Sequence, residues 1–402
     1  MYNVGTMQNP LRNVVALSAL LFVFACPAWP QAATDAKQCF WNHADPDTTV
    51  QFCTAALASG QVPADELADA FRTRGNAYVR MHDSDRAIQD LNEAIRMYPQ
   101  IMDRKPRDKA AARLAQIFLA ESFYSRGNAY SRKGDYDHAI QDYSEAIRVL
   151  PPNDGAISSR GIAYANKGDY DHAIQDFNEV IRINPQDGPR FTLSSRGNAY
   201  KGKGDYDRAL QDFNEALRLN PKDVLALDSL GTIFYERADF DRAIQHFGQA
   251  VKVLSADPYR PISDPSNYFA PLWLYLARAR GGGEAAGELK QNALRLDQAK
   301  WPGPIIRLYL GDLTPEDVWQ AAQDPDPKKN VDNACSANFF IGEYERLHGK
   351  NSEAVTLLRK AKDICPPNFK EHFAAQSELA QLENSPEHCL ARRLRITLTD
   401  PL

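Results

Sequence analysis

The sequence predicts an all-α solenoid in which antiparallel helix pairs stack side by side into a right-handed superhelix. Three observations favour this fold class: a short motif recurs along the chain, a second block follows each copy, and a proline follows each second block. The motif Arg-Gly-Asn-Ala-Tyr stands at residues 74–78, 126–130 and 196–200, with a variant at 160–164. A stride of 34 residues, as from Gly127 to Gly161, is typical of repeat architectures whose unit is one helix pair.

Each unit contains residues suited to two helices joined by a tight turn. In the second unit the small residues Gly127 and Ala139 let the helices approach closely, while the rings of Tyr130 and Tyr143 fill the space between neighbouring pairs. A Lys-Gly-Asp turn at 133–135 separates the two helices, and we expect a proline to stop each second helix. These prolines are Pro99, Pro151, Pro185 and Pro221.

These motifs resemble the tetratricopeptide repeat, in five copies between residues 64 and 256. The resemblance implies a protein-binding solenoid and no particular reaction. Periodicity returns later in the chain, where Gly342, Ala354 and Leu358 stand at the small and large positions of a sixth unit. The predicted divisions are a signal peptide at 1–33, a disulfide-stapled helical hairpin at 34–62, repeats at 63–256 with an insertion near 100–117, an irregular helical region at 257–327, the sixth unit with a capping helix at 328–383, and a tail at 384–402.

The first 33 residues predict export. Arg12 precedes an apolar run at 14–26, which is too short to span a membrane, and the small residues Ala32 and Ala33 follow at a suitable cleavage site. No other segment is apolar enough to cross a bilayer. We therefore expect a periplasmic or secreted product. The alternatives are an uncleaved anchor and a lipid anchor at Cys26, whose surroundings only vaguely resemble a lipobox.

The cysteines that remain after cleavage predict two disulfides in an oxidising compartment. Cys39 and Cys53 flank one turn, so they could staple two short helices. Cys335 opens and Cys365 closes the sixth helix pair, and an antiparallel hairpin brings its two ends together. Buried free thiols are the alternative for each pair, and Cys389 is left over, either free or intermolecular.

Composition and motifs give no sign of nucleic-acid binding or catalysis. The net charge is only -5, from 47 basic and 52 acidic residues, so the composition shows no excess of basic residues that would bind nucleic acid. The sequence has no phosphate loop, zinc-spaced cluster or hydrolase signature, so we expect no catalytic, metal-binding or cofactor-binding residues and no cofactor. One alternative remains, an unrecognised hydrolase site in residues 257–330, which contain Trp273, Trp301, Glu316 and Asp317.

The predicted binding site is the concave face of the superhelix, which the first helix of each unit lines. The expected groove residues are Arg72, Asn76, Arg80, Tyr124, Asn128, Arg132 and Asn198. Asparagine amides both donate and accept hydrogen bonds, so a spaced ladder of them can pair with an extended peptide backbone. The alternative is that these side chains only bond between adjacent helices. The family's carboxylate clamp needs lysines at a position that here holds Glu121, Gly155, Phe191 and Leu225.

The region from Trp273 onward is similar to the second half of NlpI-like periplasmic lipoproteins. The similar segments are Trp-Pro-Gly-Pro at 301–304, Leu-Tyr-Leu-Gly at 308–311, residues 338–344 and residues 371–374. That resemblance implies a dimeric adaptor for cell-wall hydrolases, although the poor lipobox does not support a membrane anchor. The sequence therefore predicts an exported scaffold that binds a protein or peptide in its groove, within envelope or peptidoglycan-enzyme assembly. A structural homodimer without an open groove is a further alternative.

Overall fold

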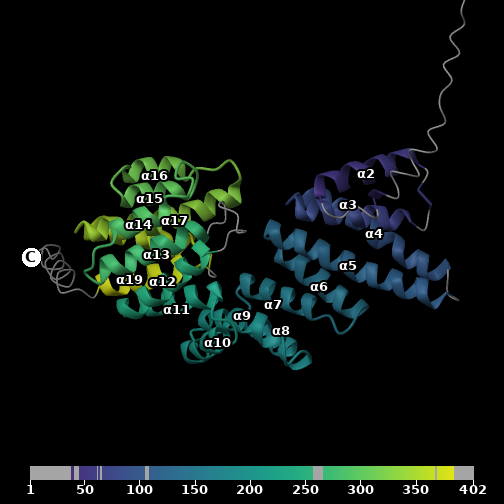
Figure 1. Cartoon of the computed structure of the whole chain (residues 1–402), viewed down its shortest axis with the longest axis horizontal. Helices are drawn as coiled ribbons and strands as arrows, with labels where there is room; N and C mark the ends of the chain where they lie inside the picture. Colours follow the sequence, from purple (N-terminus) through teal and green to yellow (C-terminus); the bar gives the residue numbers. More distant parts are fainter. Residues whose placement is uncertain are drawn as a thin grey trace, which may run out of the picture.

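A computed structural model describes residues 38–39, 45–60, 62–63, 66–104, 108–256, 266–366 and 369–383. In this part of the chain there are eighteen helices, α2 to α19, and no strand (Figure 1). Most of them pair as helix-turn-helix repeats. The predicted all-α solenoid of helix pairs is therefore confirmed.

Five successive helix pairs form the repeat region, and α2 (Pro46–Ser59) packs on the first of them. The two helices of each pair contact each other, and each second helix also contacts the first helix of the next pair. The pairs are α3 (Leu67–Arg80) with α4 (Ser84–Arg104), α5 (Lys109–Lys133) with α6 (Tyr136–Val149), α7 (Asp154–Lys167) with α8 (Tyr170–Ile183), α9 (Gly188–Gly202) with α10 (Tyr206–Leu219), and α11 (Val224–Glu236) with α12 (Phe240–Ala256).

The remaining helices form a compact half at the other end of the molecule (Figure 1). They are α13 (Ser266–Arg280), α14 (Ala286–Ala293), α15 (Gly303–Tyr309), α16 (Pro315–Ala321), α17 (Pro327–Leu347), α18 (Asn351–Ile364) and α19 (Lys370–Glu383). Helices α17 and α18 form another antiparallel pair, in which a Cβ on Gly342 would lie 3.0 Å from Cγ of Leu358.

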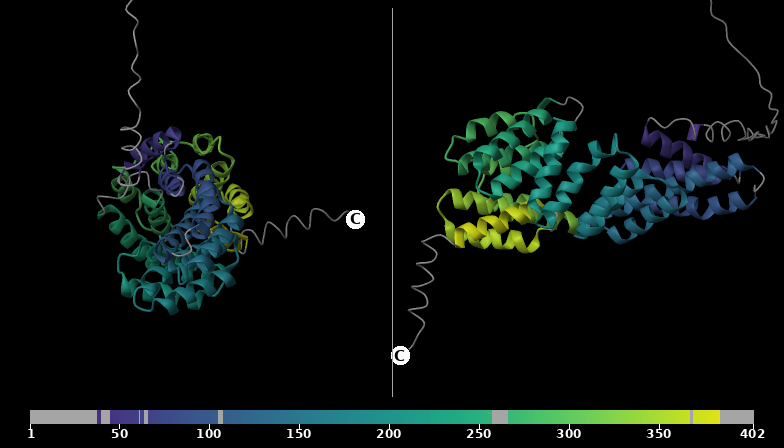
Figure 2. Two further views of the ribbon diagram at one scale, coloured as in Figure 1. Left: turned by 90° about the vertical axis from the view of Figure 1, so that its right-hand side faces the viewer. Right: turned by 90° about the horizontal axis from the view of Figure 1, so that it is seen from below.

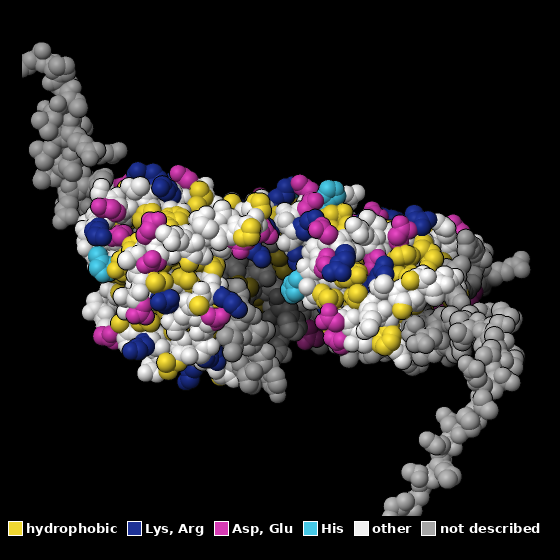
Figure 3. Space-filling view, turned by 90° about the horizontal axis from the view of Figure 1, so that it is seen from above, with side chains coloured by type: hydrophobic (Ala, Val, Ile, Leu, Met, Phe, Trp, Pro, Cys, Tyr) yellow, Lys and Arg dark blue, Asp and Glu magenta, His cyan; other side chains and the backbone are white. Residues whose placement is uncertain are grey.

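Seen along its length, the molecule winds its helices around a common axis (Figure 2, left). The start of α17 returns toward the second repeat pair, where Nζ of Lys328 donates a hydrogen bond to the carbonyl oxygen of Arg132 at 3.3 Å. The surface is hollowed between the two halves, and side chains of both charges are interspersed over the face that Figure 3 shows.

In the second, third and fourth pairs, a Gly-Asp dipeptide ends the first helix and begins the second. Gly134 and Gly168 adopt φ of +78° and +85°, a left-handed conformation that costs glycine little. The following residues, Asp135 and Asp169, are N-caps whose side chains accept hydrogen bonds from backbone N–H groups in the first turn of the next helix. The turn chemistry predicted from the sequence thus positions the second helix of these three pairs.

Within a pair, the repeat glycine faces a large side chain and the motif arginine faces an aspartate. A Cβ on Gly127 would lie 2.8 Å from Cε1 of Tyr143, so only glycine fits against that ring. Nε and Nη2 of Arg126 donate to the two carboxylate oxygens of Asp142, at 2.8 and 2.6 Å. Burial raises the pKa of the Asp142 carboxyl above its ordinary value in spite of these bonds. Equivalent pairs are Arg74 with Asp90, Arg160 with Asp176, and Arg196 with Asp212.

We expect Gly127→Ala to lower the free energy of unfolding by about 1–3 kcal/mol, because the added methyl group collides with the ring of Tyr143. Gly248→Ala is the matched control, since nothing lies within 4 Å of a Cβ there. Gly248 is inside α12, so alanine should instead stabilise the chain by roughly 0.5–1 kcal/mol. Urea unfolding of both variants measures the difference, and equal effects would contradict the interlock.

One expected helix end is wrong. Pro99 does not stop the second helix of the first unit, because α4 continues through it to Arg104. A proline in a helix loses one hydrogen bond, and here tertiary packing offsets that loss. The ring of Tyr98 is buried, and Ile101 and Met102 pack with it against α5. The predicted insertion is therefore a helical extension of α4 and α5, at least over residues 100–104 and 109–117.

A cluster of buried charges joins α11, α13, α17 and α19 in the C-terminal half. Glu343 and Glu378 are 0% and 1% exposed. The hydroxyl of Tyr235 donates to Oε2 of Glu343 at 2.8 Å, and Nη1 of Arg280 lies 3.3 Å from the same oxygen. Nη1 of Arg280 also lies 2.6 Å from Oε2 of Glu378, which contacts Arg346 as well. Through Glu378 these pairs tie α19 to α13 and α17, and Glu343 ties α17 to α11 and α13.

The structure contains both disulfides. Cys39 pairs with Cys53, which lies in α2, and Cys335 in α17 pairs with Cys365, directly after α18. The predicted signal peptide, Cys26 and Cys389 lie outside the described residues.

Candidate binding groove

The first helices of the five repeat pairs lie side by side and line what we call the inner groove, the surface of α3, α5, α7, α9 and α11 that faces the superhelix axis. Two hollows mark it. One, of about 370 Å³, includes Arg72, Asn76, Arg80 and Glu121 in its lining. The other, of about 240 Å³, lies further along the chain between α9, α11 and α19. Four of the seven predicted groove residues, Arg72, Asn76, Arg80 and Asn198, therefore line one of these hollows.

Each of the three predicted asparagines forms a hydrogen bond to a neighbouring side chain through one atom of its amide group. Nδ2 of Asn76 donates to Oε1 of Glu121 at 2.9 Å, whereas its Oδ1 is buried without a partner. Oδ1 of Asn128 accepts a hydrogen bond from the hydroxyl of Tyr143 at 2.8 Å. Oδ1 of Asn198 accepts one from Oγ of Ser229 at 2.9 Å. The bonds between helices, which the sequence left as an alternative, are thus present, and Asn128 and Asn198 keep their amide nitrogens for other contacts.

The predicted arginines and tyrosine are also engaged within the fold. Arg72 donates to Glu121 at 3.0 Å and to the hydroxyl of Tyr98 at 3.1 Å. The hydroxyl of Tyr124 accepts a bond from Ser159 at 3.4 Å. Arg132 contacts His82 at the turn of the first unit, and Arg80 lies at the exposed end of α3.

Helix α19 covers the inner face of the fifth pair and closes the groove there. Oγ of Ser377 donates to the carbonyl oxygen of Glu236 at 2.6 Å, and Nζ of Lys370 lies 2.8 Å from Oδ1 of Asp228. The sequence predicts α19 as a cap on the exposed end of the stack. It packs on α18, as a cap would, and also on the inside of α11. The open part of the groove therefore runs from α3 to α9 and ends at α19.

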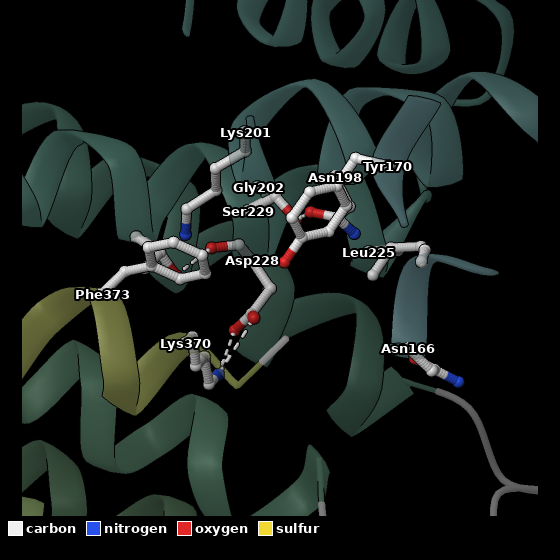
Figure 4. A pocket seen from close by; sticks show the side chains of 12 residues that line it. Asn166, Tyr170, Asn198, Lys201, Gly202, Leu225, Asp228, Ser229, Lys370 and Phe373 are labelled. Carbon is white, nitrogen blue, oxygen red and sulfur yellow. Dashed lines mark hydrogen bonds and ion pairs between the residues drawn. The ribbon is translucent and has the colours of Figure 1, made fainter. Parts of the chain in front are cut away.

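The second hollow, which we call the end pocket, lies at this closed end (Figure 4). Tyr170 and Asn198 stand on one side of it, while Lys370 and Phe373 reach it from α19. Its ionic side chains are paired, since Nζ of Lys201 lies 3.0 Å from Glu236 and Lys370 binds Asp228. Its main lining residues are Tyr170, Asn198, Lys201, Gly202, Leu225, Asp228, Lys370 and Phe373.

Four large apolar side chains lie exposed on the groove helices, namely Leu114 and Ile117 in the first turns of α5, Ile162 on α7 and Leu225 on α11. Ile162 on α7 is 43% exposed and takes the register position that Asn76 and Asn198 hold in their own units. Leu225 on α11 is 46% exposed and lines the end pocket. Both Ile162 and Leu225 are thus available to contact a segment bound in the groove.

Comparison with known families agrees with this geometry. Family models of the tetratricopeptide repeat match residues 120–153, 156–187 and 191–223, and another matches residues 72–128. The chain is a tetratricopeptide-repeat protein. Proteins with such repeats form interaction scaffolds and are generally non-enzymatic.

Several solved structures resemble this tetratricopeptide-repeat protein. A tetratricopeptide repeat protein from Parabacteroides merdae is 15% identical, with a TM-score of 0.45 over 79% of this chain and 100% of the other. MamA protein is 21% identical, with a TM-score of 0.36 over 48% and 92% of the two chains. The C-terminal part of a repeat-containing protein from Cytophaga hutchinsonii is 16% identical, with a TM-score of 0.37 over 72% and 97%.

Sequence reasoning missed most of the end pocket. Lys370 and Phe373 come from a helix far from the repeats in the sequence, so no repeat register predicts them. Gly202 does carry a signal: the first two units have Arg80 and Arg132 at the equivalent position, five residues after the repeat glycine. The glycine leaves room for the ring of Tyr170, which a Cβ would approach to 2.4 Å. Burial raises the pKa of the Tyr170 hydroxyl above its ordinary value.

The residues of the alternative hydrolase site do not converge. Trp273 is fully buried in the core, whereas Glu316 and Asp317 lie exposed on α16, where Asp317 forms a capping box with Thr314. Over the described residues, no group of three or more side chains could hold a metal ion. None of the described helices is long and apolar enough to cross a membrane.

Proposed function

We propose that this tetratricopeptide-repeat protein is a scaffold that holds a segment of a partner protein in its inner groove, from α3 to the end pocket beside α11 and α19. The observation that carries the proposal is the exposure of Ile162 and Leu225 on the groove helices. Burying both against a partner removes apolar surface from water, which favours association. The amide nitrogens of Asn128 and Asn198, whose oxygens are bonded within the fold, can donate hydrogen bonds to a peptide backbone.

The mixed charges of the groove favour a peptide over a polyanion. Arg72 is already paired with Glu121, and Lys201 with Glu236. The groove therefore offers no row of unpaired cations for the phosphates of a nucleic acid. A protein segment with apolar and amide groups matches this lining better.

We expect the double variant Ile162→Glu with Leu225→Glu to lose partner capture. Each glutamate would place a carboxylate without a counter-ion in the interface, so binding should fall by at least about tenfold. The assay is affinity capture from the organism's own envelope extract, with the recovered partner quantified against the wild type. The fold should survive, because both positions are about half exposed.

The matched control is Leu294→Glu with Ile364→Glu. These leucine and isoleucine side chains are 71% and 38% exposed and lie beyond α14 and at the end of α18, outside the groove helices. The control carries the same added charge and should capture the partner like the wild type. Equal capture by both double variants would exclude the groove as the binding site.

We further propose that the chain is exported to the periplasm or secreted, and that residues 1–33 are removed. Two disulfides support an oxidising compartment. The resemblance of the region after Trp273 to NlpI-like lipoproteins supports a role in envelope or peptidoglycan-enzyme assembly, with Cys26 as the alternative lipid-anchor site. The mass of the chain recovered from the envelope tests export. A product that retains residues 1–33 and carries free thiols at all four pairing cysteines would contradict it.

A further inference from the structure

The charges of the end pocket are balanced within the chain itself. Lys201 is paired with Glu236, and both side chains are 7% exposed. Lys370 is bound by both carboxylate oxygens of Asp228, at 2.8 and 2.9 Å. A charged side chain entering the pocket would have to break one of these pairs or stay uncompensated, and either outcome is costly. The pocket therefore favours an uncharged occupant.

The walls and size of the pocket favour one large apolar side chain. Leu225 forms one wall, and the rings of Tyr170 and Phe373 form others (Figure 4). The ring of Tyr170 lies close against Gly202, where the arginines of the first two units would fill the space. The volume of about 240 Å³ is below the usual range for small-molecule sites, so a whole cofactor is too large for it.

The pocket also continues an interface that already exists. Helix α19 lies along the inner face of α11, from Lys370 near Asp228 to Ser377 near Glu236. The pocket begins where α19 begins, and Phe373 of α19 packs against Lys201 there, with Nζ 5.2 Å from the ring centroid. A partner segment that lies in the groove and ends at α19 would add its own contacts beside those between α11 and α19, on the side that leads to Ile162. The amide nitrogen of Asn198, whose oxygen is held by Ser229, stands beside that path.

We infer that the end pocket anchors the partner segment by one uncharged side chain of leucine or phenylalanine size, and that Leu225, Tyr170 and Phe373 select it. This inference rests on the groove as the binding site. It adds the class of ligand: a peptide with an isolated large apolar residue, and no charged residue next to it, which ends against α19.

A random peptide library displayed on phage tests the assignment, with the mature chain as bait. Peptides enriched by the wild type should share one leucine, phenylalanine or similarly large apolar residue without a charged neighbour. Leu225→Glu should bind these peptides at least about tenfold more weakly. A fresh selection on Leu225→Glu should enrich lysine or arginine instead, because the new carboxylate needs a counter-ion. A purely structural role of Leu225 would not change the selected residue in this way.

Leu294→Glu is the control, and it should select the same peptides as the wild type. A shared charged residue in the wild-type selection, or an unchanged selection on Leu225→Glu, would overturn the pocket assignment while leaving the groove proposal intact. Failure to enrich any peptide, together with capture unaffected by Ile162→Glu with Leu225→Glu, would overturn both.

Discussion

Glu378→Ala is expected to lower the free energy of unfolding of the C-terminal half by about 3–5 kcal/mol, the usual cost of removing one partner of a buried ion pair. Glu378 is 1% exposed and accepts both Arg280 and Arg346, which come from different helices. Alanine would leave two guanidinium groups with one buried carboxylate, Glu343. Burial already lowers the pKa of Arg346, which means that its charged form is poorly solvated. Removal of its carboxylate partner should therefore cost much of the folding free energy of this half.

Trp273 gives the readout, because its ring is buried in the core of the same half. Tryptophan fluorescence during urea unfolding should show a lower midpoint for the variant. Glu383→Ala is the matched control on the same helix, since Glu383 pairs with Arg359 where both side chains are exposed, at 42% and 56%. An exposed pair contributes about 0–1 kcal/mol, so the control should change little. Equal losses in the two variants would show that the buried cluster does not hold α19.

The repeat pairs could be predicted from the sequence because their contacts are local. Gly127 meets Tyr143 within one unit, and the stride that reveals the pair also sets the register. The sixth pair followed from the same rule, and the structure brings Gly342 and Leu358 together as expected. The Arg126–Asp142 pair could have been found too, since arginine and aspartate stand 16 residues apart in four units.

The groove and the end pocket were less predictable because their contacts are long-range. Periodicity placed Asn76 on the inner face but could not show that Glu121 of the next unit bonds to it. The path of α19 depends on how far the C-terminal helices curl inward, which no local pattern encodes. The buried charges show the same limit, since Tyr235 and Glu343 are 108 residues apart in the chain. Pro99 failed as a helix stop because packing against α5 outweighed its local preference.

The double variant Cys335→Ser with Cys365→Ser is expected to lose about 3–4 kcal/mol of stability, from the chain entropy of a loop with a separation of 30 residues. The thiol positions are buried, so reduction of the wild type should produce the same loss once the bond is opened. The melting temperature, measured with and without reductant, checks this. The double variant should lose less on reduction than the wild type, because reductant then opens only the Cys39–Cys53 bond, whose separation is 14 residues.

The same variant should also weaken partner capture. The Cys335–Cys365 bond fixes the chain directly after α18. Cys365 lies five residues before Lys370, and the ion pair of Lys370 with Asp228 holds α19 over the inner groove. A looser α18 would let Lys370 and Phe373 leave the end pocket, which would then lose one wall. Capture below the melting temperature should therefore fall in the double variant, while Cys39→Ser with Cys53→Ser, far from the pocket along the chain, should leave it unchanged. Full capture by both variants would mean that partner binding does not need α19 in place.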